Sequence, residues 1–248
     1  MKLTNVQRED IEFTIEDMFF HLKARLLGKY FTGPKIYFEV VEQTNPLETL
    51  EGVYNFTYNM LYGAGAKPNP KRVKQLMKIT GNYLDAERLR TVNHVLNAIE
   101  SAKTFDDVKE VVEKQMDKTN GYVNMLVGNE IRNIQANAEK EGIEKLGAAI
   151  GVEDPVVCKL GVVDDKLCKY CRPLWHTEAN PFVPKVYRLS ELKNGYMNHK
   201  DPEPTILASH PHCRHVLTMV PPNFGFSDKG VITFKGFGYD IYAEQRGE

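Results

Sequence analysis

Apolar residues recur every three or four positions through most of the first 150 residues, a spacing typical of amphipathic helices. The first such segment spans residues 5–30. Its apolar side chains are Ile11, Ile15, Met18, Phe19, Leu22, Leu26 and Leu27. We expect this helix to stop at Gly33 and Pro34, because proline lacks the amide proton that a continuing helix needs.

Asparagine followed by proline marks two further helix starts, since asparagine caps the free amides and proline suits the first helical position. These signals are Asn45-Pro46 and Asn69-Pro70. The first predicts a helix to about residue 62. The second opens a helical pattern that runs to residue 99, as one long helix or as two with a kink at Gly81.

Thr104 and Asp107 form a capping pair that predicts a helix through residue 118, and residues 122–146 carry a further helical pattern. The short run 36–41 is rich in aromatic and β-branched residues. It fits a strand, although its length leaves a helix or a loop open.

The composition changes after Gly151, where proline and glycine multiply and short apolar runs replace the helical spacing. These runs are residues 156–163, 216–220 and 231–234. We therefore predict an α+β protein: a mostly helical domain, residues 1–150, followed by a small β- and loop-rich domain, residues 151–248.

Charge and hydropathy exclude several classes of protein. The net charge is −1, and acidic and basic residues are interspersed, which argues against strong nonspecific binding to nucleic acid or to an anionic membrane. The first ten residues turn charged before any apolar run forms, unlike a secretory signal, and no stretch reaches the roughly 18 apolar residues of a membrane span. We expect the protein to stay in the cytoplasm in which it is made.

Cysteine and histidine gather beyond the predicted boundary. The pairs Cys168-x-x-Cys171 and His210-x-x-Cys213 share a spacing that aims both side chains of each pair at one ion. Three thiolates and one imidazole suit tetrahedral zinc and leave no open position for a reacting water. We therefore predict one structural zinc ion held by Cys168, Cys171, His210 and Cys213.

Alternatives to this ligand set remain. Cys168 and Cys171 could instead be a redox pair or buried thiols, although the region lacks the βαβ pattern of a thioredoxin-like motif. His215 could replace His210, because it faces the same side as Cys213 on an extended strand. Pro211 restricts the turn and favours His210.

The remaining polar residues near this motif receive simpler interpretations. Cys158 lies in an apolar run and is expected in the core. Asp164 and Asp165 are expected to cap loop amides, to pair with Arg214 in support of the site, or to be solvated. The scattered histidines are read as surface or internally satisfied residues: His21, His94, His176 and His199.

No catalytic pattern is evident. Lys71, Lys74 and Lys78 share a helical face that could contact phosphate, but a solvated face is the preferred interpretation. The glycines form no phosphate-binding motif, and no matched acid and base pair is recognisable, so we expect no enzyme. The helical region carries many aromatics that are either core residues or anchors for a partner: Phe13, Phe19, Phe20, Phe31, Tyr54, Phe56, Tyr58 and Tyr62.

The order of the motifs resembles the phage Mu F-like head morphogenesis family, which comprises minor capsid proteins. The resemblance rests on residues 164–174, an acidic turn before C-x-x-C and a leucine, and on residues 210–215, which resemble the family's H-P-x-C-R-C. A helix around residues 129–139 fills the place before the first motif. The similarity covers about residues 122–217.

Three positions depart from the family pattern. His215 stands where the family has its last cysteine, and Trp175 stands where a glycine is usual. Gly128-Asn129-Glu130 replaces the Arg-Thr-Glu that often opens the family's helix. The chain is therefore similar to a diverged member.

The resemblance implies a structural virion protein of the phage head. Such a protein acts in head assembly near the portal vertex and contacts the portal or the major capsid protein. The competing hypothesis is a zinc-supported DNA-binding protein or a His-Asn-His-like nuclease with His212 as its base. That reading needs a second metal, for which no ligand set is evident.

Overall fold

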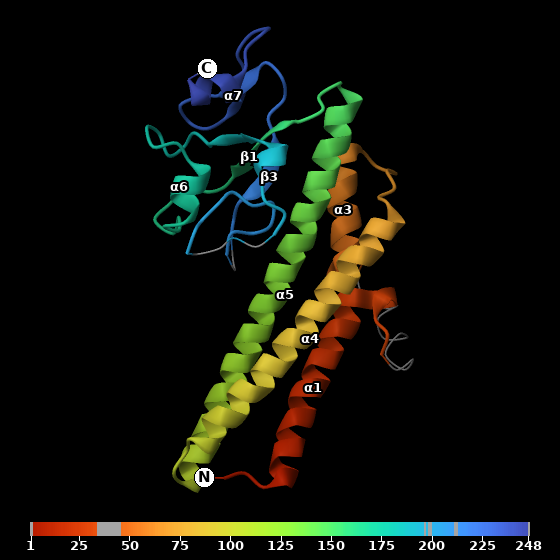
Figure 1. Cartoon of the computed structure of the whole chain (residues 1–248), viewed down its shortest axis with the longest axis vertical. Coiled ribbons are helices and arrows are strands. Elements are labelled where there is room, and N and C mark those ends of the chain that lie inside the picture. The colour runs from red at the N-terminus through yellow and green to blue at the C-terminus, as the bar shows by residue number, and fades with distance from the viewer. Residues whose placement is uncertain (1, 34–45, 196, 198–199, 211–212, 248) are drawn as a thin grey trace. The chain divides into compact units, whose positions relative to one another are not determined.

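The computed structural model describes residues 2–33, 46–195, 197, 200–210 and 213–247. Long helices occupy most of the first 149 residues, and short strands, loops and small helices follow (Figure 1). This arrangement confirms the predicted α+β class. The run 36–41 lies outside the described residues. None of the described helices carries an apolar stretch long enough to cross a membrane.

Helix α1 (Asn5–Leu27) packs along helix α4 (Pro70–Glu100) (Figure 1). Both helices begin as capping residues require: Thr4 and Gln7 form a capping box, and the amide of Lys71 donates to Asn69 Oδ1 over 3.0 Å. α4 runs through Gly81 as one helix. A Cβ atom at Gly81 would lie 3.3 Å from Leu27 Cδ1, so glycine allows the two helices to approach closely.

Helix α3 (Leu50–Tyr62) begins later than the asparagine and proline signal predicted. Pro46–Glu48 instead forms a 3₁₀ turn, η2, ahead of the helix. The hydroxyl of Thr49 accepts a hydrogen bond from the amide of Gly52 over 3.0 Å, which makes Thr49 the capping residue. Asn45 lies outside the described residues.

Helix α5 (Phe105–Ala149) is one continuous helix where the sequence pattern suggested two segments. The Thr104 and Asp107 capping pair is confirmed, with reciprocal bonds of 2.8 and 3.1 Å. Thr119 and Val123 are buried, so the packed face continues across the expected break between residues 118 and 122.

The chain divides into two compact units. One consists of Met1–Val53 and Pro68–Ile131, and the other of Tyr54–Lys67 and Arg132–Glu248. Helices α3 and α5 therefore contribute residues to both units. The predicted domain boundary near residue 150 rests on the change in composition alone, so it stays a prediction.

A small antiparallel sheet organises the second unit. Strand β1 (Val156–Leu160) lies between β2 (Val186–Arg188) and β3 (Val216–Met219), and β4 (Phe224–Phe226) pairs with β5 (Ile232–Phe234). The three predicted apolar runs contain β1, β3 and β5. β2 and β4 were not predicted, because Arg188 and Gly225 leave no continuous apolar run in either strand. The short helices α6 (Cys171–Trp175) and α7 (Ile241–Arg246) complete this region together with the 3₁₀ turn η3 (Leu189–Glu191).

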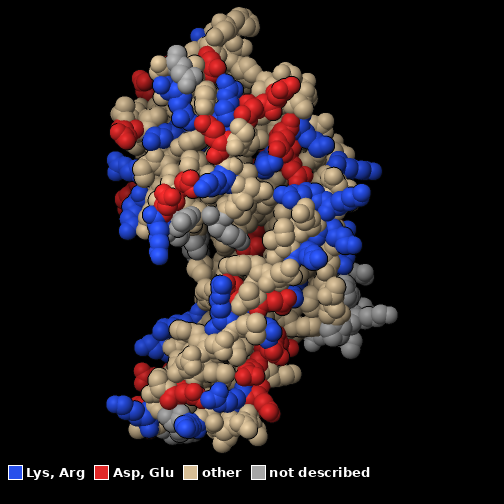
Figure 2. Space-filling view, viewed as in Figure 1, with Lys and Arg blue, Asp and Glu red and all other residues tan. Residues whose placement is uncertain are grey.

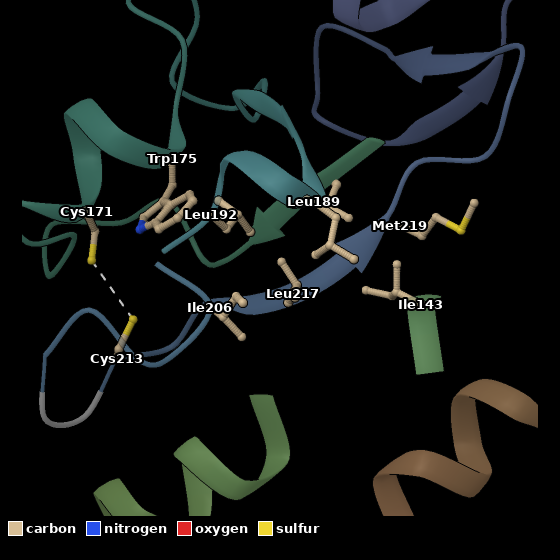
Figure 3. Packing of buried hydrophobic residues seen from close by; sticks show 10 residues of the cluster. Ile143, Cys171, Trp175, Leu189, Leu192, Ile206, Cys213, Leu217 and Met219 are labelled. Carbon is tan, nitrogen blue, oxygen red and sulfur yellow. Dashed lines mark hydrogen bonds between the residues drawn. The ribbon is translucent and has the colours of Figure 1, made fainter. Parts of the chain in front are cut away.

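A hydrophobic cluster connects the three-stranded sheet with α6 (Figure 3). Its fully buried centre is Trp175, whose Nε1 donates to Ser209 Oγ over 3.0 Å. Cys171 and Cys213 belong to the same cluster, and their side chains point toward one another from separate segments. Two of the predicted zinc ligands are therefore held by the core of this unit.

Candidate metal centre

The first cysteine pair forms a tight turn at the start of α6. The amide of Cys171 donates to Cys168 Sγ over 3.1 Å, and the amide of Arg172 donates to the carbonyl of Cys168 over 3.1 Å. Such amide bonds stabilise sulfur in its thiolate form, the form that binds metals. Both sulfurs are thereby aimed at the same side of the turn.

The second pair approaches Cys171 from the segment before β3. The amide of Cys213 donates to the carbonyl of His210 over 3.1 Å, which closes the turn across this pair. Cys213 Sγ lies 4.0 Å from Cys171 Sγ (Figure 3). Two thiolates bound at about 2.3 Å to one tetrahedral zinc ion stand about 3.8 Å apart, so the observed spacing fits a shared ion.

Five potential ligands gather at this place. The ligand atoms of Cys168, Cys171 and His210 lie within 4.8 Å of one another, as do those of Cys171, Cys213 and His215. Cys171 belongs to both groups. The four residues predicted from the sequence and the alternative histidine therefore form one cluster that can hold a metal ion.

The thiols of the cluster influence each other's ionisation. Their hydrogen bond lowers the pKa of Cys213 and raises the pKa of Cys171, because one thiolate is stabilised by the neighbouring thiol. All four cysteines are free thiols. A bound cation would displace the shared proton and hold every sulfur as thiolate.

A buried lysine contributes positive charge beside the sulfurs. Lys159 on β1 is 2% exposed, and its ammonium donates to the carbonyl of Leu207 over 2.7 Å and lies 4.6 Å from the Trp175 ring centre. Burial lowers its pKa to about 8, an effect opposed by the negative groups of Cys213 and Glu139. These negative groups favour the charged form of Lys159, and its charge in turn favours the thiolate forms.

Two arginines hold the segment that carries Cys213 and His215. Arg132 from α5 donates to the carbonyls of both residues over 2.9 and 3.1 Å. Arg214 makes a bidentate ion pair with Asp164 at 2.6 and 2.7 Å, and this bond lowers the pKa of the Asp164 carboxyl to about 2. The predicted pairing with Arg214 is confirmed for Asp164, which also accepts from the amide of Lys166.

His176 joins the cluster, a contact that the sequence did not predict. It is 3% exposed, its Nδ1 lies 2.6 Å from the carbonyl oxygen of Pro181, and its Nε2 lies 3.0 Å from His215 Nε2. Burial lowers the pKa of His176 and favours its neutral form. The only signal in the sequence is that His176 lies five residues after Cys171.

Cys158 lies elsewhere in the structure, and two of the histidines lie outside the described residues. Cys158 is 1% exposed in a second hydrophobic cluster, where burial raises its pKa to about 12, so the predicted core role is confirmed. His199 and His212 lie outside the described residues.

The lysine face of α4 is solvated, as predicted. Lys71, Lys74 and Lys78 are exposed, and the last two line an open hollow of about 680 Å³ with Lys23 and Lys29. Lys23 pairs with Asp85 at 2.9 Å and Lys29 with Glu51 at 2.8 Å. Half of the cationic charge in the hollow is thus neutralised, which weakens the case for a phosphate site.

No protein-family model, curated protein or solved structure matches this chain.

Proposed function

We propose that the second unit carries one structural zinc ion, bound by Cys168, Cys171, Cys213 and one imidazole of the cluster. The observation that carries this proposal is the convergence of three sulfurs and the histidines from two separate turns. Thiolate-rich sets select zinc in preference to magnesium, calcium or manganese. With four protein ligands the ion has no open position, so it stabilises the fold and activates no water.

Elemental analysis of the full chain, purified without chelator, tests the zinc ion. We expect about one zinc per chain in the wild-type protein and none in the Cys171→Ser variant. A matched control is Cys158→Ser, because Cys158 is equally buried but belongs to a different cluster. Wild-type protein without zinc, or zinc retained by Cys171→Ser, would contradict the zinc proposal.

At the level of the whole protein, we propose a minor structural component of a phage head that binds portal or capsid proteins. The support is the similarity of residues 164–174 and 210–215 to the head morphogenesis family. Asp164 and Arg214, one from each of these motifs, pair directly. The charge balance also suits a protein-binding role, since acidic and basic side chains are interspersed on the face seen in Figure 2.

Exposed aromatic side chains supply a contact surface for this role. Of the aromatic residues singled out in the sequence, Phe13, Phe56 and Tyr62 are exposed by 72, 54 and 46%. The interpretation that all of them belong to the core is therefore wrong. On α3, Phe56 lies one turn from Met60, which is 72% exposed. Buried aromatics dominate interface energetics, so this pair is the part of α3 best suited to anchor a partner.

Binding to purified portal and capsid proteins tests the assembly role. The double variant Phe56→Ser and Met60→Ser should weaken capture at least tenfold, because the apolar anchors are lost. Ile79→Ser is the matched control, since Ile79 is also an exposed apolar side chain but lies on α4. Failure of the wild-type protein to bind either partner contradicts the assembly role and leaves the zinc proposal standing.

The alternative function is a zinc-supported DNA-binding protein or nuclease. It is tested by incubating the chain with plasmid and linear DNA in Mg²⁺, Mn²⁺ or Zn²⁺. We expect no cleavage, because a closed ligand set offers no catalytic metal position. Metal-dependent cleavage that is lost in His212→Ala would contradict a purely structural role and would support the nuclease hypothesis.

A further inference from the structure

Two histidines and a backbone carbonyl form a hydrogen-bonded chain that ends at the sulfur cluster. The chain runs from the carbonyl of Pro181 through His176 to His215. The separations are 2.6 Å from oxygen to His176 Nδ1 and 3.0 Å between the two Nε2 atoms. His215 Nδ1 then lies 3.6 Å from Cys213 Sγ.

The positions of the heavy atoms determine where the protons lie when both rings are neutral. A carbonyl oxygen only accepts, so His176 Nδ1 carries a proton and its Nε2 carries a lone pair. Two nitrogens 3.0 Å apart share one proton, which must then belong to His215 Nε2. The remaining nitrogen, His215 Nδ1, presents its lone pair beside Cys213.

The separation from Cys213 matches metal coordination. A thiolate at about 2.3 Å and an imidazole nitrogen at about 2.0 Å from one tetrahedral zinc ion are about 3.5 Å apart. The observed distance from Cys213 Sγ to His215 Nδ1 is 3.6 Å. Histidines that bind metals characteristically donate their other N–H to a fixed acceptor, which sets the tautomer and the ring orientation.

We propose that His215 binds the metal through Nδ1, and that His176, held by the Pro181 carbonyl, is the positioning residue that fixes its tautomer. This inference rests on the proposed zinc ion and selects between its two candidate imidazoles. His210 then contributes through its carbonyl, which closes the turn to Cys213. The cluster is completed by Cys168, Cys171 and Cys213.

The surroundings of His215 support this assignment. Arg132 holds the carbonyls of Cys213 and His215 together, and these residues alternate with the exposed Arg214. Their side chains therefore leave the extended chain on the same side. His176 is buried beside α6, whose first residue is Cys171, so one short element places both a ligand and the positioning histidine.

The first measurement is zinc affinity of the full chain by competition with a chromophoric chelator. We expect His215→Ala to weaken binding at least tenfold more than His210→Ala. His176→Leu should weaken it about 10- to 100-fold, as removal of an outer-shell partner does. His176→Gln places an acceptor oxygen near the former Nε2 and should restore affinity to within a few-fold of wild type.

The second measurement is the histidine nitrogen spectrum of ¹⁵N-labelled wild-type protein loaded with zinc, which does not depend on any variant folding. We expect a proton on His215 Nε2, a metal on His215 Nδ1 and a proton on His176 Nδ1. A zinc-bound protein in which His215 Nδ1 is protonated overturns the inference. Equal or larger losses in His210→Ala overturn it too, whereas wild-type protein without zinc refutes the proposed function itself.

Discussion

Gly161 lies directly against the imidazole of His215. A Cβ atom at position 161 would stand 2.5 Å from His215 Cδ2 and 2.7 Å from its Nε2, the atom that faces His176. No side chain fits there unless the ring moves. Glycine at the end of β1 therefore leaves the space that the imidazole occupies.

Gly161→Ala should displace the His215 ring and lower zinc affinity about tenfold, the smaller end of what disturbed outer contacts cost. Gly195→Ala is the control, because nothing lies within 4 Å of a Cβ at that position. Chelator competition compares the two variants. Unchanged affinity in Gly161→Ala would mean that the position of the His215 ring is irrelevant to the metal.

Cys171→Ala should lower the stability of the second unit far more than that of the first, because the binding energy of a structural metal is folding energy. Cys171 is shared by both ligand groups and is fully buried. Hydrogen exchange over β1 and β3, compared with α1, measures the difference. Equal loosening of all three elements would indicate one inseparable cooperative structure.

Metal removal should be visible in the fluorescence of Trp175, the only tryptophan of the chain. Trp175 is fully buried and packs in the same cluster as Cys171 and Cys213. Stripping zinc with excess chelator should shift its emission to longer wavelength as water reaches the ring, and added zinc should reverse the shift. The same treatment should leave the emission spectrum of Cys171→Ala unchanged. A wild-type spectrum that does not respond to chelator would contradict the coupling between metal binding and the packing around Trp175.

Glu139 should make the protein less stable as the pH rises from 4.5 to 7. Glu139 is 5% exposed and accepts from the amide of Leu217 over 3.0 Å, and burial raises the pKa of its carboxyl from 4.5 to about 7. Between these values the unfolded chain has released a proton that the folded chain keeps, so the free energy of unfolding falls with pH. The total fall is about 3 kcal/mol, at 1.36 kcal/mol per pH unit.

Glu139→Gln tests this dependence, since glutamine resembles the protonated acid. Urea unfolding at saturating zinc, at pH 5 and at pH 7.5, gives the two free energies. We expect the advantage of Glu139→Gln over wild type to grow by about 2 to 3 kcal/mol between these conditions. A constant difference would show that Glu139 titrates normally in the folded protein.

Local signals in the sequence sufficed where the physics is local. Capping by Thr104 and Asp107, the start of α4 at Asn69 and the tight turn of Cys168 and Cys171 each depend on residues within a few positions of one another. The Asn45-Pro46 signal predicts the start of α3 too early, because Thr49 supplies a competing cap closer to the helix. The α+β class followed from the change in hydrophobic spacing near residue 150.

The tertiary structure alone decided which distant groups meet. His176 and His215 are 39 positions apart, and Lys159 reaches the carbonyl of Leu207 across 48. Nothing in the pattern of either residue indicates its partner, because the contacts arise from how β1, α6 and β3 pack around Trp175. The sequence by itself determined which side chains can bind a metal. Which imidazole faces the sulfurs depends on the direction in which the packed chain holds each ring.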